Sequence, residues 1–143
     1  MFKLKKILNK HNNAPEIEIL DMEQATIGAM ERIYYLTNAK LAFYSNDSER
    51  PTFYVGLRVL DDYSSERRME CYRITPDMIF EVKHTTTTRA GDKFKLISTT
   101  ESEGFSQVTT FDVTSSEENH GYVVDASNQK TTGKILIRFH CYQ

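Results

Sequence analysis

The sequence has no tryptophan, only two cysteines and three prolines, and no long apolar run. No stretch approaches the roughly 18 consecutive apolar residues of a membrane helix. The first 15 residues also lack the apolar core of a secretory signal, so we expect neither a membrane partner nor a leader. Basic and acidic residues nearly cancel, 18 against 20, whereas a dedicated nucleic-acid binder normally shows a strongly basic face. We therefore expect no nucleic-acid partner.

The sequence also lacks every linear motif of catalysis or metal binding that we sought. The four histidines have no metal-type spacing, no glycine-rich phosphate loop occurs, and no Ser/His/Asp arrangement stands out. Asp61–Glu66 offers oxygens for calcium, but a hydrated hairpin tip fits it better. We expect a protein that is not an enzyme, with no cofactor, no metal site and histidines scattered over its surface. Cys71 and Cys141 are interpreted as reduced, buried or half-buried small apolar residues, although a disulfide is possible if their strands pair.

Apolar residues recur with a period of two along most of the chain, which is typical of strands with one face on a core. Turn-rich clusters separate these segments at the spacing of a small barrel or sandwich. The fold class that follows is all-β, a single small β-barrel domain. We expect strands around Ile17 and Ile19 and at Ile33–Leu36, Lys40–Tyr44, Phe53–Leu60, Met69–Ile74, Met78–Val82, Lys93–Ser98, Phe105–Val113, Gly121–Ala126 and Ile135–Phe139.

The first 15 residues differ from the rest in charge. They carry four lysines and no acid, so a segment of +4 precedes a body of about −6. One interpretation is a short surface helix or a frayed terminus, and another is an extended arm that lies along a neighbouring molecule. The domains we expect are a basic amphipathic N-terminal arm, residues 1–15, and an all-β barrel, residues 16–143. A short helix within Met22–Leu36 is the remaining helical candidate, weakened by Gly28 and its β-branched neighbours.

The order of several segments resembles one protein family. The opening FKLKKILNK, followed by NAPEIEIL, is similar to the arm at the start of head-decoration (capsid cement) proteins of tailed phages and prophages of Gram-positive bacteria. Further stretches look like strands of that family in the same order: Arg50–Gly56, Cys71–Val82, Ala90–Leu96 and Gly133–Phe139. Where the family has a glycine-rich turn, this chain has Thr37-Asn38-Ala39, and Asn38 can replace a glycine at a left-handed position.

The resemblance implies a β-tulip-like barrel that stands on the outer surface of a capsid, as a homotrimer, and stabilises the shell without catalysis. Its partner would be the major capsid protein, and its location the virion surface, after assembly in the host cytoplasm. The arm would attach it, with three lysines facing acidic capsid surface and two isoleucines supplying β-augmentation. The implied capsid-binding residues are the apolar Phe2, Leu4, Ile7 and Leu8, the basic Lys3, Lys5 and Lys6, and the isoleucines Ile17 and Ile19.

Two other classes stay open at this level. One is a β-barrel ligand-binding module, for carbohydrate or protein, that would use exposed aromatic residues in a groove. The other is an enzyme or nucleic-acid-binding barrel whose site no linear motif reveals. Tyrosine and arginine, which interfaces favour, occupy outward positions of the expected strands: Tyr35, Tyr54, Tyr72, Arg58, Arg73 and Arg138.

Overall fold

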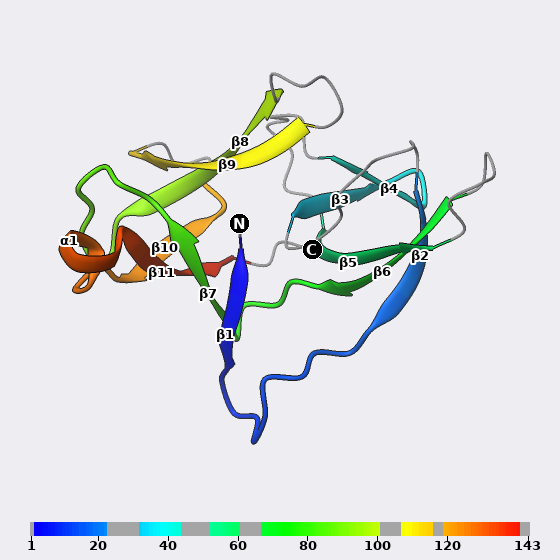
Figure 1. Ribbon diagram of the computed structural model, residues 1–143, viewed down its shortest axis with the longest axis horizontal. Coiled ribbons are helices and arrows are strands. Elements are labelled where there is room, and N and C mark those ends of the chain that lie inside the picture. Colours follow the sequence, from blue (N-terminus) through cyan, green and yellow to red (C-terminus); the bar gives the residue numbers. More distant parts are fainter. Residues whose placement is uncertain are drawn as a thin grey trace. The chain divides into compact units, whose positions relative to one another are not determined.

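The computed structural model describes residues 2–22, 32–43, 52–60, 67–100, 107–115 and 119–140. Nearly all regular structure in these ranges is β-strand, which confirms the all-β prediction (Figure 1). The strands are β1 Lys3–Ile7, β2 Glu18–Met22, β3 Ile33–Thr37, β4 Lys40–Phe43, β5 Phe53–Leu60, β6 Arg67–Arg73, β7 Met78–Lys83, β8 Lys93–Thr100, β9 Gln107–Thr114, β10 Gly121–Asp125 and β11 Lys134–Phe139; the helix is α1 Gln129–Thr132.

The chain divides into two compact units, each assembled from segments that are distant in sequence. Unit 1 comprises Met1–Ala14, Thr75–Leu96 and Phe111–Cys141. Unit 2 comprises Pro15–Ile74, Ile97–Thr110 and Tyr142–Gln143. The basic opening segment therefore groups with two much later segments of the chain.

Unit 2 contains a closed barrel with the strand order β2-β4-β3-β5-β6. Neighbouring strands are antiparallel, except that β2 and β4 meet in parallel at Met22 and Leu41. Closure matters because it pairs the sheet's edges with each other. The barrel interior is filled by alternate residues of these strands, the buried Met22, Tyr34, Leu41, Tyr54, Met69 and Cys71, against which Leu20, Leu36 and Val59 pack.

The turn between β3 and β4 has an unusual backbone. Asn38 and Ala39 both have positive φ, 49° and 62°, as the two central residues of a type I′ hairpin turn require. This confirms the left-handed position predicted for Asn38. Ala39 adopts the same conformation with a Cβ, which is sterically less favourable than glycine there.

The second sheet has six strands in the order β1-β7-β11-β10-β8-β9 (Figure 1). One face of it forms the core of unit 1, because alternate residues of β7, β11 and β8 are buried. The Phe139 ring packs edge-on against Phe80 and Phe94, with centroids 5.6 and 5.2 Å apart. Gly121 of β10 allows this approach, since a Cβ there would collide with the Arg138 carbonyl oxygen and the Phe94 ring.

A short helix joins β10 to β11 where the sequence predicts only a turn-rich cluster. α1 ends at Gly133, whose φ of 69° gives the left-handed cap common at helix ends. The Gln129 side chain then fixes the polar segment after β7: its Nε2 donates to the carbonyl oxygens of His84 and Thr86, and its Oε1 accepts from the Thr88 amide. The Gln129 side chain thus satisfies three backbone groups of a segment that forms no strand.

Each predicted strand has a counterpart in the structure, and the predicted boundaries agree with the observed ones to within two residues, with Ile17 just before β2. A helix reaching Leu36 is wrong, because Ile33–Thr37 forms β3; residues 23–31 lie outside the described residues. A surface helix or a frayed terminus is also wrong for residues 3–7, which form β1. Gly91, in the turn before β8, has a positive φ of 94°. The proposed calcium or hairpin-tip segment, residues 61–66, and Cys141 lie outside the described ranges.

Candidate interaction surfaces

The apolar residues of the opening segment are used inside unit 1. Phe2 is 4% exposed and Ile7 is 2% exposed, while Leu4 and Leu8 are half-buried. The Phe2 ring lies 6.2 Å from that of Phe139. The two buried members of the predicted set of capsid anchors, Phe2 and Ile7, therefore hold β1 on its own sheet.

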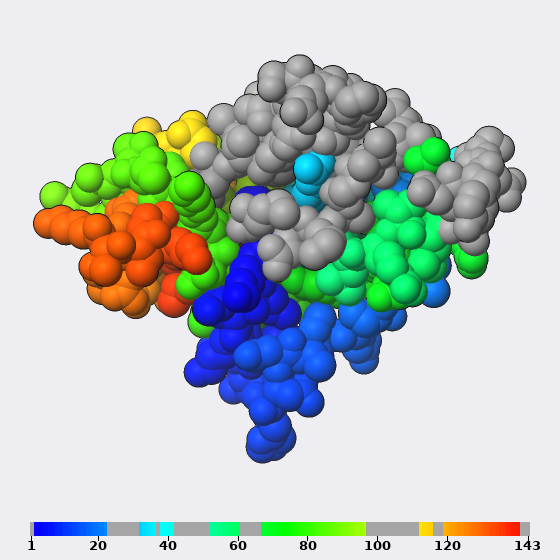
Figure 2. Space-filling view, in the orientation of Figure 1, coloured from blue at the N-terminus to red at the C-terminus, as the bar shows by residue number. Residues whose placement is uncertain are grey.

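The lysines of the same segment are exposed. β1 pairs antiparallel with β7, and the register shifts between Leu4 and Lys6, which is a β-bulge. The bulge lets Leu4 and Ile7 pack inward although they are three positions apart, and it leaves Lys3, Lys5 and Lys6 exposed. β1 stands at one end of the strand order, and a bulge with lysines is also how edge strands avoid unwanted pairing. Figure 2 shows this dark-blue segment at the surface.

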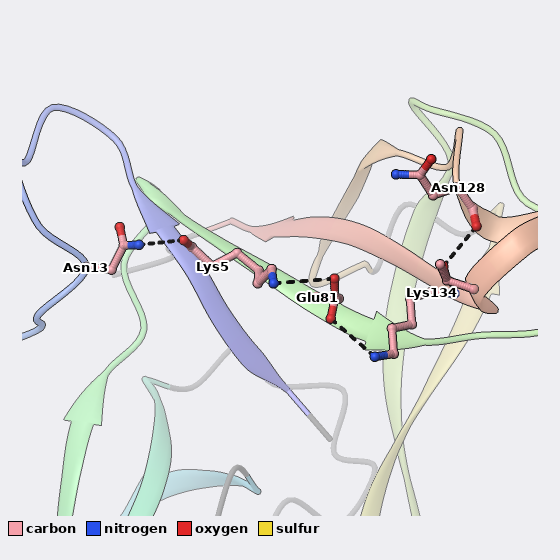
Figure 3. Close-up of polar contacts among 6 residues, drawn as sticks. Lys5, Asn13, Glu81, Asn128 and Lys134 are labelled. Atoms are coloured by element: carbon pink, nitrogen blue, oxygen red, sulfur yellow. Dashed lines mark hydrogen bonds and ion pairs between the residues drawn. The ribbon is translucent and has the colours of Figure 1, made fainter.

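The chain after β1 is fixed by side chain to backbone hydrogen bonds. The Asn13 Nδ2 donates to the Lys5 carbonyl oxygen at 2.7 Å (Figure 3), and the Asn13 Oδ1 accepts from the Ile7 amide at 3.2 Å. The Leu8 amide donates to the Asp77 carbonyl oxygen at 2.8 Å. These bonds anchor both ends of the bend that follows Ile7, so the basic segment has a defined shape.

A carboxylate lies between two ammonium groups beside this strand. Glu81 of β7 is 3.8 Å from Lys5 Nζ and 3.6 Å from Lys134 Nζ (Figure 3). Because both lysines are about half exposed, each pair contributes at most about 1 kcal/mol. The cluster lines a hollow of about 250 Å³, whose walls are Lys5, Glu81, Asp125, Asn128, Thr132, Lys134, Ile135 and Leu136.

Asp125, at the rim of this hollow, is held in its charged form. It accepts a hydrogen bond from the Ser127 amide at 2.8 Å. This bond, together with that from the Ser127 side chain, lowers the pKa of the Asp125 carboxyl. The hollow therefore brings two ammonium groups, two carboxylates and the polar side chains of Asn128 and Thr132 together with the apolar Ile135 and Leu136.

Ile17 and Ile19 lie on unit 2 with half of their surface exposed, 50% and 52%. The sequence predicts alternation here and the structure confirms it, but with the faces exchanged: Leu20 and Met22 point into the barrel, and the isoleucines point out. Ile19 stands opposite Glu70, which pairs with Arg58 at 3.3 Å. Ile19 thus lies beside a charged pair, and exposed apolar side chains with polar neighbours are typical of small interfaces.

β2 has a neighbouring strand on each of its two sides. β6 pairs with β2 along the full length of β2, from Glu18 to Met22. On the other side, the described residues show a register only between Met22 and Leu41. Because β2 pairs with β6 on one side and with β4 on the other, closing the barrel, β-augmentation by this strand stays a prediction.

The tyrosines predicted to lie outward are mainly buried. Tyr54 points into the barrel, and Tyr72 is buried as well. Burial raises the pKa of the Tyr54 hydroxyl. Tyr35 is half-buried, whereas Arg58 and Arg73 are exposed as predicted. The outward aromatic set was wrong because β5 and β6 are buried on both faces near these positions, which a period-two pattern cannot reveal.

The position of Cys71 agrees with the prediction, whereas the histidines depart from the predicted surface positions. Cys71 is a free, buried thiol, and its burial together with the nearby Glu18 charge raises its pKa to about 12. His120 is buried, contrary to the prediction of surface histidines, and its Nδ1 accepts a 2.9 Å hydrogen bond from the Leu96 amide. His84 is half-buried, and desolvation lowers its pKa. Among the described residues, no group of three or more His, Cys, Asp or Glu is placed to hold a metal.

Sequence reasoning missed Glu81 and Lys134 because they come from separate strands. Glu81 occupies a polar position of the predicted strand Met78–Val82, and Lys134 directly precedes the predicted strand Ile135–Phe139. Only the register of β7 with β1 and β11 brings them together. No helix among the described residues has the length and apolar character needed to span a membrane. No protein-family model matches the chain, and no curated protein or solved structure matches it either.

Proposed function

We propose that the chain is a non-enzymatic head-decoration protein, which binds the outer surface of a phage capsid and stabilises the shell. The exposure of Ile17 and Ile19 on an otherwise well-packed barrel is the observation that carries this proposal. Exposed apolar residues that a barrel could have buried are expected where a partner covers them. The resemblance of the segment order to capsid cement proteins supplies the class of partner, the major capsid protein.

In this proposal the predicted residues have different roles in attachment to the capsid. Ile17 and Ile19 are the apolar contacts, and Lys3, Lys5 and Lys6 face acidic groups of the shell. Phe2 and Ile7 act indirectly, because their burial keeps β1 in place and presents the lysines. Copies held as a homotrimer on a repeating lattice gain from multivalency, so a modest contact per copy gives durable attachment.

The test uses expanded heads that lack the decoration protein, from the phage or prophage whose genome encodes the chain. Burying the exposed half of one isoleucine stabilises a complex by about 1 kcal/mol. We therefore expect the double variant Ile17→Ser, Ile19→Ser to bind heads about 30-fold more weakly in co-sedimentation. Thr87→Ser is the control, since Thr87 is an exposed residue of the polar segment after β7, outside β2, and it should bind within about twofold of wild type.

Two results would overturn the proposal. Wild-type protein that does not co-sediment with heads excludes capsid binding outright. Full binding by the double serine variant excludes the isoleucines as the contact. Deleting residues 2–15 is an unsuitable test, because the deletion removes β1 together with the buried Phe2 and Ile7.

The ligand-binding alternative has less support. It requires tyrosines arranged in a groove, and Tyr54 and Tyr72 are buried. Sugar-dependent protection of the protein from proteolysis, lost in a Tyr35→Ala variant, would favour that alternative over the decoration function.

A further inference from the structure

The outer face of the six-stranded sheet in unit 1 is strongly basic. Its strands bury one set of alternate residues, and the opposite set consists mainly of cations. We call this surface the basic face. Its cations come from four strands: Lys3, Lys5 and Lys6 of β1, Lys83 of β7, Lys134 and Arg138 of β11, and Lys93 and Lys95 of β8.

The register of the sheet concentrates these charges. Lys134 stands directly opposite Lys83, a like-charge cross-strand pair that destabilises a sheet. The described strand residues of this face include two acids, Glu81 and Asp125, and Glu81 already lies between Lys5 and Lys134. In the described part of the chain no carboxylate is paired with Lys83. The face therefore keeps an excess of positive charge that folding alone does not require.

The groups between the cations indicate what kind of anion fits. Ile79 and Leu136 are half-buried on this face, so apolar surface lies among the lysines. Tyr122, the aromatic residue of β10, is already engaged: Arg138 Cζ lies 6.0 Å from its ring centroid and the His140 ring 5.7 Å away. Binding of single-stranded nucleic acid depends on open aromatic platforms. A mixed apolar and cationic surface better fits a protein segment that carries carboxylates.

The hollow beside Lys5 and Lys134 gives this partner a defined point of contact. It has a volume of about 250 Å³, and Glu81 lies in it between the two ammonium groups (Figure 3). Glu81 thus occupies the position that an incoming aspartate or glutamate would take. Asn128 and Thr132, from the start and end of the α1 region, line the same hollow and provide further polar groups.

We infer that the basic face is the docking surface for an acidic protein segment, with one carboxylate of the segment competing with Glu81 for Lys5 and Lys134. The inference rests on the proposed function for the identity of the partner, an acidic part of the shell. It extends the contact from three lysines of β1 to the whole face. The chemistry that it requires, recognition of carboxylates by this face, is testable without phage heads.

The probe is poly-L-glutamate, titrated into the full-length protein at low ionic strength and again at 0.3 M salt. We expect salt-sensitive binding that weakens about tenfold in the double variant Lys83→Gln, Lys134→Gln. The matched control is Lys10→Gln, Lys40→Gln, which removes the same charge from exposed lysines off this face, and it should stay within about twofold of wild type. Glu81→Gln should bind the probe several-fold more tightly, because it releases both lysines.

Each other outcome overturns the inference. Equal losses in the two double variants would mean that net charge alone drives binding. If Glu81→Gln binds poly-L-glutamate as wild type does, or more weakly, then Glu81 does not compete with the probe for Lys5 and Lys134. Tighter binding of a single-stranded or duplex oligonucleotide of equal charge, with the same dependence on Lys83 and Lys134, would assign the face to nucleic acid. If the protein binds poly-L-glutamate as expected but does not bind heads, only the proposed function is contradicted. Thermal unfolding of every variant verifies that it is folded.

Discussion

Replacing Ile7 with alanine tests whether the opening segment is a structural strand of unit 1. Ile7 is the last residue of β1, opposite Met78 of β7, and is 2% exposed. A segment that leaves the body to lie on a neighbour would tolerate this change. A strand packed on its own sheet would lose buried contacts and leave a cavity.

The expected magnitude follows from the burial of the side chain. Fully buried isoleucine replaced by alanine costs about 2–5 kcal/mol, and we expect about 2.5 kcal/mol because a strand at the end of a sheet can partly collapse. With a urea slope of roughly 2 kcal/mol per molar, the unfolding midpoint falls by about 1.2 M. Circular dichroism gives the midpoint, and hydrogen exchange of β7 amides reports the loss of β1 pairing specifically.

Lys6→Ala is the control, since Lys6 is the exposed neighbour and its replacement should cost less than about 0.5 kcal/mol. Hydrogen exchange in β7 should accelerate in Ile7→Ala and not in Lys6→Ala. If the Ile7→Ala protein unfolds at the midpoint of wild type, with unchanged exchange in β7, the packing of β1 against its own sheet is refuted.

Three further predictions follow from local geometry. Ala39→Gly should stabilise the protein by about 0.5–1 kcal/mol in urea unfolding, because glycine relieves the positive φ of Ala39; a loss of stability would contradict the type I′ turn. In a Cys141→Ser background, the thiol of Cys71, with its pKa raised to about 12, should resist a disulfide reagent at pH 8 until the protein is unfolded; rapid native-state modification would contradict its burial. Because burial lowers the pKa of His84, the unfolded state binds more protons below about pH 6.5, so stability should fall as the pH drops from 7 to 5. His84→Gln should reduce that fall, and an unchanged pH dependence would remove His84 as its cause.

The sequence predicts strand positions well where alternation is uninterrupted. Ile135, Ile137 and Phe139 alternate without a break, and β11 buries all three. β1 escaped prediction because its bulge separates Leu4 from Ile7 by three positions, which resembles a helical spacing. A bulge depends on the partner strand, β7, more than 70 residues away, so local pattern could not reveal it.

The sequence predicts the interaction residues less completely, because periodicity defines two faces without saying which faces inward. Ile17 and Ile19 were assigned correctly to one face of a strand, but that face points outward. Barrel closure decides this, since Met22 must meet Leu41 inside the barrel and thereby fixes the orientation of every residue of β2. The outward isoleucines are a departure from the usual pattern that a partner would explain.

The net charge of the whole chain likewise does not show how charge is distributed between the two units. The chain is nearly neutral, but unit 1 has 11 basic against 7 acidic residues, +4, and unit 2 has 7 against 13, −6. At physiological ionic strength, charges act over about 8 Å, so a partner in contact with the basic face responds to the lysines there and not to the total of −2. The near-neutral composition therefore does not by itself exclude an anionic partner. What distinguishes carboxylate from phosphate is the local chemistry, the half-buried Leu136 and the occupied ring of Tyr122 beside the cations.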